Sequence, residues 1–225
     1  MIINRVEYLN KLIAWKDKQL IKLVTGVRRC GKSMLLEIYQ DYLKNQGVTD
    51  QQIIAINFED LDYEELTDYK KLYSYLKERL VPGKMTYIFL DEIQNVNDFP
   101  KVLDSLYIKK NVDIYVTGSN AYMLSSEIDT MISGRYVQIE MLPLSFKEYI
   151  ESTGNMNDRG IKYTEYLENS SFPYALQLKN QPNEIREYLE GIYNTIVVKD
   201  IVHRKNITDT MMLKSVLKFV FDKIG

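Results

Sequence analysis

The stretch Leu23–Leu36, "LVTGVRRCGKSMLL", restricts the possible folds of this chain more than any other. A short, β-branched run ends at Gly26, four variable residues follow, and Gly31-Lys32-Ser33 opens an apolar pattern with helical spacing. A strand joined to a helix by such a glycine-rich turn is typical of a phosphate-binding loop, in which successive backbone N–H groups point inward. The sequence therefore predicts a strand–loop–helix unit that binds phosphate groups.

Several positions of this loop have an expected chemical role. Gly26 and Gly31 let the backbone wrap around phosphate oxygens, which the positive end of the following helix also stabilises. Lys32 is expected to reach the β- and γ-phosphates, and the Ser33 hydroxyl is expected to ligate Mg²⁺. The competing interpretation is an ordinary glycine turn with a surface lysine. The predicted nucleotide-binding residues of the loop are Gly26, Val27, Arg28, Arg29, Cys30, Gly31, Lys32, Ser33 and Met34.

The variable positions of the loop allow more than one interpretation. Arg28 and Arg29 could contact a phosphate or bind acidic residues of a partner domain, and the sequence does not choose between these roles. Cys30 is interpreted as a small side chain that fills the loop rather than as a redox site. It is the only cysteine, so the 225-residue chain cannot form an internal disulfide.

A second motif supports the phosphate loop. The apolar run "YIFL" is followed directly by Asp91 and Glu92. At the end of a buried strand, Asp91 would hold the Mg²⁺ and Glu92 would accept a proton from the attacking water. The alternative is that both residues are solvated acids at the end of a strand, without a role in catalysis. Switch GTPases usually carry D-x-x-G here and N/T-K-x-D elsewhere; neither pattern occurs, which favours adenine over guanine.

Two weaker candidates follow. The fourth predicted strand ends in "VTGSN", where Ser119 or Asn120 could orient the attacking water or touch the γ-phosphate, or could simply cap the next helix. In "SGRYVQIEM", Arg135 stands at the entry to the fifth predicted strand. An arginine there is either a side chain that stabilises transition-state charge or a surface residue of a turn.

Strands and helices alternate over the first 143 residues. The runs "QLIKLVTG", "QIIAINF", "MTYIFLDE", "VDIYVTGSN" and "YVQIEM" are strand-like, and helical spacing separates them. This alternation predicts an α/β fold with a parallel sheet and helices on both faces. Helical patterns alone follow Pro143, which predicts a second, all-helical unit. An amphipathic segment at the end of the chain needs a packing partner, so we expect a truncated chain.

Overall composition narrows the class of protein. The net charge is −2, which gives no indication of a nucleic-acid or membrane partner. His203 is the only histidine, which excludes a His-rich metal centre and disfavours a Ser-His-Asp triad. Neither a secretory signal nor an apolar run of membrane-spanning length is present, so we expect a cytoplasmic protein without a membrane partner.

The motifs "TGVRRCGKS", "INFED", "IFLDEIQ", "VTGSN", "SGRY" and "LPLSFKEY", in this order, resemble the AAA-like P-loop ATPases of bacteria and archaea. The resemblance implies a P-loop NTPase sheet of order 5-1-4-3-2, a helical lid, then a winged helix and a nuclease-like module. It implies domains at 1–143 (ATPase), 144–206 (lid) and 207–225 (start of a winged helix). By the same resemblance, Arg135 stands where AAA+ proteins place an arginine finger that acts on a neighbouring subunit, and the sequence leaves open whether it acts in its own site or in a neighbour's.

Together these observations predict a Mg²⁺-dependent ATPase that couples its nucleotide state to movement of the lid and the C-terminal domain. The predicted catalytic residues are Lys32, Glu92, Asn120 and Arg135, and the predicted metal ligands are Ser33 and Asp91. A slow nucleotide-controlled switch, which needs a partner subunit or nucleic acid for hydrolysis, is the alternative. A P-loop kinase is disfavoured, because Glu92 beside Asp91 suits activation of water. The sequence leaves the client, the oligomeric state and the turnover rate open.

Overall fold

A computed structural model describes residues 3–119, 132–154, 158–178, 181–196, 202 and 207–224. The chain divides into two compact units, Met1–Pro173 and Tyr174–Gly225. Within the described part of the chain, no helix is both long enough and apolar enough to cross a bilayer.

The first unit is built on a five-stranded sheet in which every neighbouring pair of strands is parallel. The strand order is β2-β3-β4-β1-β5, which is the expected order 5-1-4-3-2 counted from the opposite edge. The predicted α/β fold and strand order are therefore confirmed. The strands are β1 (Ile21–Gly26), β2 (Ile53–Asn57), β3 (Thr86–Asp91), β4 (Val112–Ser119) and β5 (Tyr136–Met141).

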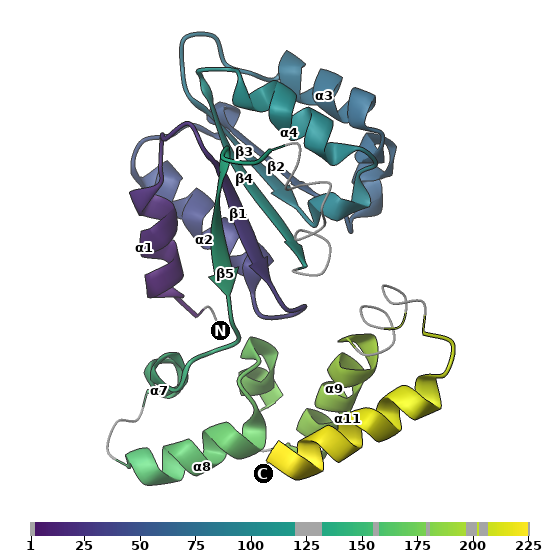
Figure 1. The fold of residues 1–225 in the computed structure, drawn as a ribbon. Coiled ribbons are helices and arrows are strands. Elements are labelled where there is room, and N and C mark those ends of the chain that lie inside the picture. The colour runs from purple at the N-terminus through teal and green to yellow at the C-terminus, as the bar shows by residue number, and fades with distance from the viewer. Residues whose placement is uncertain are drawn as a thin grey trace. The chain divides into compact units, whose positions relative to one another are not determined.

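Helices cover both faces of this sheet, as the continuous apolar strands predict (Figure 1). Successive strand residues point to opposite faces, so Leu23 and Val24 of β1 belong to two different apolar clusters. One cluster packs under α1 (Val6–Ala14) and α2 (Lys32–Asn45), and the other packs under α3 (Tyr69–Glu78) and α4 (Phe99–Tyr107). Burial on both faces explains why β1 and β3 contain no exposed residue.

The described residues after Leu144 form helices and no strand, in agreement with the helical pattern. In the first unit, α7 (Phe146–Thr153) begins with a capping box in which Ser145 and Glu148 bind each other's backbone N–H, and α8 (Arg159–Asn169) follows. In the second unit lie α9 (Pro182–Asn194) and α11 (Thr210–Ile224). Short 3₁₀ turns occupy Asp50–Gln52, Leu61–Thr67, Ile93–Asn95 and Pro173–Leu178.

The expected boundaries of the domains differ from the division into compact units. The compact units separate after Pro173, so α7 and α8 group with the sheet rather than with the later helices. The division into 1–143, 144–206 and 207–225 stays a prediction. Of the helical segments expected between the strands, the one over residues 121–132 lies outside the described residues except at Ile132.

The parallel sheet brings the carboxyl ends of all its strands to one edge. Gly26 pairs with Ser119 of β4 and with Met141 of β5, and Asn57 pairs with Asp91. The next strand in the chain after β1 is β2, which forms one edge of the sheet. β1 itself lies between β4 and β5, so the direction of the strand order reverses at this point. Open α/β sheets bind ligands at such a point, outside the carboxyl ends of the strands.

Candidate nucleotide-binding site

The loop between β1 and α2 needs glycine at two positions for two different reasons. A Cβ placed on Gly26 would lie 2.2 Å from the Met141 carbonyl oxygen, because β5 passes directly alongside. Gly31, the residue before α2, has a φ of 101°, a backbone conformation that disfavours a side chain. The two glycines therefore set the shape of the loop, one by permitting close contact and the other by permitting the turn.

Cys30 fills the inside of this loop, as its small size suggested. Its side chain is fully buried, and burial raises the pKa of the thiol, which keeps it protonated and poorly reactive. Arg29 has a positive φ of 64°, and Arg28 lies 3.6 Å from the carboxylate of Glu59. Arg28 thus contacts an acidic residue of its own domain.

Lys32 is the first residue of α2 and is only 4% exposed. Its ammonium group donates to the carbonyl oxygens of Gly26 and Val27, both at 3.3 Å, and lies 3.6 Å from the Glu92 carboxylate. These contacts are long for charge-assisted hydrogen bonds, which are typically about 2.7–2.9 Å. The lysine is therefore held at the loop by weak bonds that a phosphate oxygen can replace.

Asp91 is the last residue of β3, Glu92 follows it, and both are buried. Thr117 of β4 connects them, because its hydroxyl donates to the Asp91 carboxylate and accepts the Glu92 backbone N–H at 2.9 Å. Glu92 has a φ of 52°, which is unfavourable for a residue with a side chain and is found mainly where surrounding contacts impose it. The turn swings the Glu92 side chain toward Lys32.

Glu92 has a second neighbour in Gln94, whose amide nitrogen donates to the carboxylate oxygen Oε2. The other carboxylate oxygen, Oε1, faces the ammonium group of Lys32. Glu92 is therefore positioned from two sides, by a neutral donor of its own turn and by the cation of the loop.

The two predicted metal ligands line one cavity of about 290 Å³. Ser33 contributes a hydroxyl and Asp91 a carboxylate, and Asn57 of β2 lies on the same wall. The described residues hold no cluster of three or more acidic, histidine or cysteine side chains that could bind a metal alone. One carboxylate and one hydroxyl suit Mg²⁺, which takes oxygen ligands and completes its shell with water and substrate phosphates.

The remaining predicted loop and strand-end residues are less constrained. Val27 and Met34 are partly exposed, at 38% and 41%, on either side of the glycine turn. Ser119 ends β4 in register with Gly26, so its backbone lies at the binding edge. Asn120 lies outside the described residues.

Arg135 lies at the opposite end of the sheet from the phosphate loop. Its carbonyl oxygen accepts the backbone N–H of Ile21, the first residue of β1, whereas the loop begins after Gly26. Five residues of parallel strand separate these two levels by about 17 Å. The guanidinium pairs with Asp104 of α4 and lies 5.4 Å from the ring centre of Tyr107. From this position Arg135 does not reach the loop of its own chain.

Sequence reasoning missed three residues that shape the site. Thr117 could have been found, because it is a polar residue in an apolar strand, two positions before the candidate Ser119. Gln94 ends the motif "IFLDEIQ", but its position there does not indicate that it donates to Glu92. Arg5 donates to the Cys30 carbonyl oxygen from 25 positions away, and no local signal marks that contact.

This sheet order, with a glycine-rich loop after a central strand and an Asp-Glu pair after the strand two places away, defines a P-loop nucleoside triphosphatase fold. A model of the AAA domain family matches residues 18–150, which is more than half of the chain. The chain belongs to this family and is an AAA-type P-loop ATPase domain, a class that binds nucleotides.

Two curated relatives are similar over most of the chain. An uncharacterized protein of Haemophilus influenzae is 39% identical over 230 residues, covering 100% of this chain and 56% of the relative. Uncharacterized protein MJ1544 of Methanocaldococcus jannaschii is 33% identical over 220 residues, covering 89% of this chain and 47% of the relative. The chain thus spans about half the length of the curated relatives it matches.

A solved structure supports the fold. The Walker-type ATPase PABY2304 of Pyrococcus abyssi matches with a TM-score of 0.59 and 13% sequence identity. The match covers 91% of this chain and 76% of that protein. At this level of identity the likeness concerns the arrangement of helices and strands only.

Proposed function

We propose that the protein hydrolyses ATP in the presence of Mg²⁺, with Glu92 as the base that activates water. The observation that carries this proposal is the buried contact between Lys32 and Glu92 at 3.6 Å, directly beside Asp91. A phosphate chain bound by the loop would lie next to the carboxylate that accepts the proton. A carboxylate at this place can accept the proton of a water molecule that attacks the γ-phosphate.

In this proposal each residue has one task. The loop amides and Lys32 bind the β- and γ-phosphates, and Lys32 exchanges its long bonds to loop carbonyls for bonds to phosphate. Ser33 and Asp91 hold Mg²⁺, which neutralises charge on the phosphates when it is bound. Thr117 fixes the Asp91 carboxylate, and Gln94 keeps the Glu92 side chain turned toward the loop.

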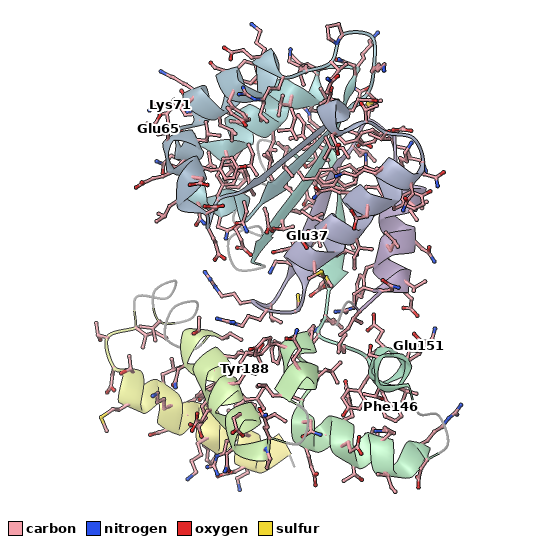
Figure 2. The ribbon with its side chains drawn as sticks, turned by 180° about the vertical axis from the view of Figure 1, so that it is seen from behind. Glu37, Glu65, Lys71, Phe146, Glu151 and Tyr188 are labelled. Atoms are coloured by element: carbon pink, nitrogen blue, oxygen red, sulfur yellow. The ribbon has the colours of Figure 1, made fainter. Side chains whose placement is uncertain are left out.

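The test is phosphate release by the wild type and by Glu92→Gln, with Mg²⁺–ATP affinity measured separately. We expect the variant to bind ATP but to release phosphate about 10²–10⁴ times more slowly, because an amide cannot accept the proton. Glu65→Gln is the control: Glu65 is exposed and lies 3.6 Å from Lys71 (Figure 2). Equal rates in the wild type and Glu92→Gln would remove Glu92 from the mechanism.

The position of Arg135 favours a second candidate function, a switch that hydrolyses ATP slowly until a second copy of the chain binds. In this version Arg135 leaves Asp104 and reaches the site of a neighbour. Rates per subunit that rise with protein concentration in the wild type, but not in Arg135→Ala, would support a homo-oligomer. Nucleic acid as the activator is suggested by the family resemblance alone, and stimulation of phosphate release by added DNA tests it.

We further propose that nucleotide state moves the helices that follow β5. The last residue of β5, Met141, lies against Gly26 of the loop, and α7 begins five residues later. A loop that tightens around phosphate would act on this junction directly. Hydrogen exchange in α7 that changes when Mg²⁺–ATP is added would support the coupling, and exchange that stays constant would contradict it.

A further inference from the structure

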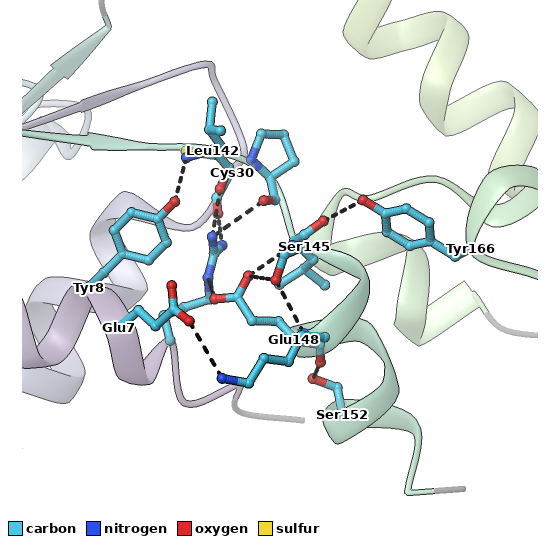
Figure 3. Close-up of polar contacts among 12 residues, drawn as sticks. Glu7, Tyr8, Cys30, Leu142, Ser145, Glu148, Ser152 and Tyr166 are labelled. Carbon is cyan, nitrogen blue, oxygen red and sulfur yellow. Dashed lines mark hydrogen bonds and ion pairs between the residues drawn. The ribbon is translucent and has the colours of Figure 1, made fainter. Parts of the chain in front are cut away.

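Arg5 is a buried arginine that connects the phosphate loop to the end of β5. It precedes α1, and its side chain is 3% exposed. Nη1 donates to the Cys30 carbonyl oxygen at 2.9 Å, and Nη2 donates to the carbonyl oxygens of Leu142 at 2.6 Å and Pro143 at 3.4 Å. Nε donates to the Glu148 carboxylate at 2.7 Å. The contacts can be followed in Figure 3, where Cys30, Leu142 and Glu148 are labelled.

The bond to Cys30 has a consequence for the next residue of the loop. The peptide between Cys30 and Gly31 is planar and trans, so its C=O and its N–H point in opposite directions. A carbonyl held toward Arg5 therefore turns the Gly31 N–H away from Arg5. In a loop of this type, the N–H groups before the helix are the phosphate donors.

The guanidinium is also held by two further side chains, Glu148 and Tyr8. Glu148, which accepts from Nε, also accepts the backbone N–H of Ser145 at 2.9 Å and so begins α7. The Tyr8 ring lies 4.8 Å from the guanidinium carbon, and its hydroxyl oxygen accepts the Leu142 N–H at 3.2 Å. Because a guanidinium is planar and rigid, fixing one side also fixes the direction of Nη1. A lysine has one flexible donor group and cannot satisfy all these acceptors.

We propose that Arg5 is a positioning residue of the phosphate loop, which orients the Cys30–Gly31 peptide so that the Gly31 N–H faces the phosphate. Arg5 itself does not touch the nucleotide. The proposal rests on the proposed function in that the phosphate belongs to a bound nucleotide. It adds a residue outside the loop motif, 26 positions before Gly31, to the determinants of affinity.

Calorimetry of the full 225-residue chain with Mg²⁺–ADP tests the proposal in Arg5→Met and Arg5→Lys. We expect affinity to fall about tenfold or more in Arg5→Met, the size of one charge-assisted hydrogen bond. Arg5→Lys should be intermediate, and it carries the test alone if Arg5→Met does not fold. Tyr166→Phe is the matched control: it removes a 2.8 Å hydrogen bond to Leu144 at the same junction, without a contact to the loop. Its affinity should equal that of the wild type.

A second measurement separates positioning from general loosening of the structure. In ¹H–¹⁵N spectra of the nucleotide-free protein, the Gly31 amide signal should move in the Arg5 variants and stay in place in Tyr166→Phe. Arg5 variants that bind Mg²⁺–ADP like the wild type, or that leave the Gly31 signal unchanged, overturn the proposal and leave the proposed function intact. A wild type without affinity for Mg²⁺–ADP overturns the proposed function and this proposal with it.

Discussion

The sheet domain has a buried lysine–carboxylate pair at each end of the sheet, and the two pairs differ in how completely they are hydrogen-bonded. At the amino-terminal end, Lys22 of β1 pairs with Asp113 of β4, with side chains 0% and 1% exposed. At the carboxyl-terminal end, Lys32 lies 3.6 Å from Glu92, with side chains 3% and 10% exposed. The same two kinds of charge are thus buried to a similar depth in two different settings.

The amino-terminal pair has a partner for nearly every polar atom. Lys22 donates to Asp113 and to the Lys18 carbonyl oxygen at 2.6 Å. The second oxygen of Asp113 accepts the Asp17 backbone N–H and the Tyr115 hydroxyl, both at 2.8 Å. Burial lowers the pKa of Lys22 and raises the pKa of Asp113, so desolvation opposes both charges. Such a pair contributes little net stability while intact, but leaves a costly charge when broken.

The carboxyl-terminal pair is bonded loosely by comparison. The ammonium group of Lys32 has two 3.3 Å contacts to carbonyl oxygens, and Glu92 has one amide donor, from Gln94. This difference in hydrogen bonding distinguishes a pair with a structural role from a pair that is available to bind a ligand. A saturated pair is part of the core, whereas a loosely bonded pair can take a new partner at low cost.

Replacing each lysine by methionine should lower stability by unequal amounts and is the strongest test of the comparison. We expect Lys22→Met to lower the free energy of unfolding by about 3–5 kcal/mol, because Asp113 is left buried without its counter-charge. Lys32→Met should lower it by about 1 kcal/mol or less, since only long contacts are lost. Stabilisation by Mg²⁺–ATP should disappear in Lys32→Met. Urea unfolding with and without Mg²⁺–ATP measures both effects, and equal destabilisation by the two substitutions would contradict the comparison.

Gly26→Ala tests whether the loose bonding at the carboxyl-terminal end is limited to the side chains of Lys32 and Glu92, or extends to the backbone. The backbone there is tightly packed, because the new Cβ would lie 2.2 Å from the Met141 carbonyl oxygen. We expect a loss of about 1–3 kcal/mol, typical of overpacking, together with loss of Mg²⁺–ATP binding. Gly83→Ala is the control. Its φ is positive, at 73°, unlike that of Gly26, and no atom lies within 4 Å of the added carbon.

Gly83→Ala introduces a conformational cost without a steric clash, whereas Gly26→Ala introduces a clash without a positive φ. Gly83→Ala should cost about 1–2 kcal/mol from backbone conformation and leave binding intact. Thermal unfolding and calorimetry of both variants give the comparison. A Gly26→Ala variant that binds Mg²⁺–ATP normally would show that β5 can move away from the loop.

A feature of this structure could be predicted from the sequence where the residues that form it are close together along the chain. Gly26, Gly31, Lys32 and Asp91 were found because each adjoins a strand or helix end with a recognisable pattern. The strand order came from family resemblance, since strand patterns do not state which strands are neighbours. For the same reason the Lys22–Asp113 pair could not be predicted, because it depends on β1 lying beside β4.

Two residues show different limits of sequence reasoning. The position of Arg135 could have been derived, because a residue that opens a parallel strand must lie far from residues that end its neighbours. Arg5 could not have been derived, because its partners Cys30 and Leu142 are 25 and 137 residues away. Only the folded chain brings these groups together.

The last expected effect appears only at alkaline pH and concerns the tyrosines around the amino-terminal pair. Tyr115 donates to Asp113, the Tyr39 hydroxyl lies 2.9 Å from the Tyr115 hydroxyl, and Tyr87 donates to Asp17 at 2.8 Å. Burial raises the pKa of all three phenols above the ordinary value of 10, that of Tyr87 to about 12. The folded state therefore keeps protons that the unfolded state loses above pH 10.

Stability should consequently be complete below pH 10 and fall as pH rises toward 12 and beyond. Each buried phenol contributes a slope of about 1.4 kcal/mol per pH unit. Tyr39→Phe should remove one such contribution and flatten the curve of unfolding free energy against pH, whereas Tyr193→Phe, at a 39% exposed position, should not. Urea unfolding at a series of pH values measures the slopes. A wild-type curve that stays level above pH 10 would mean that the hydroxyls reach solvent, and that the amino-terminal pair is as open as the carboxyl-terminal one.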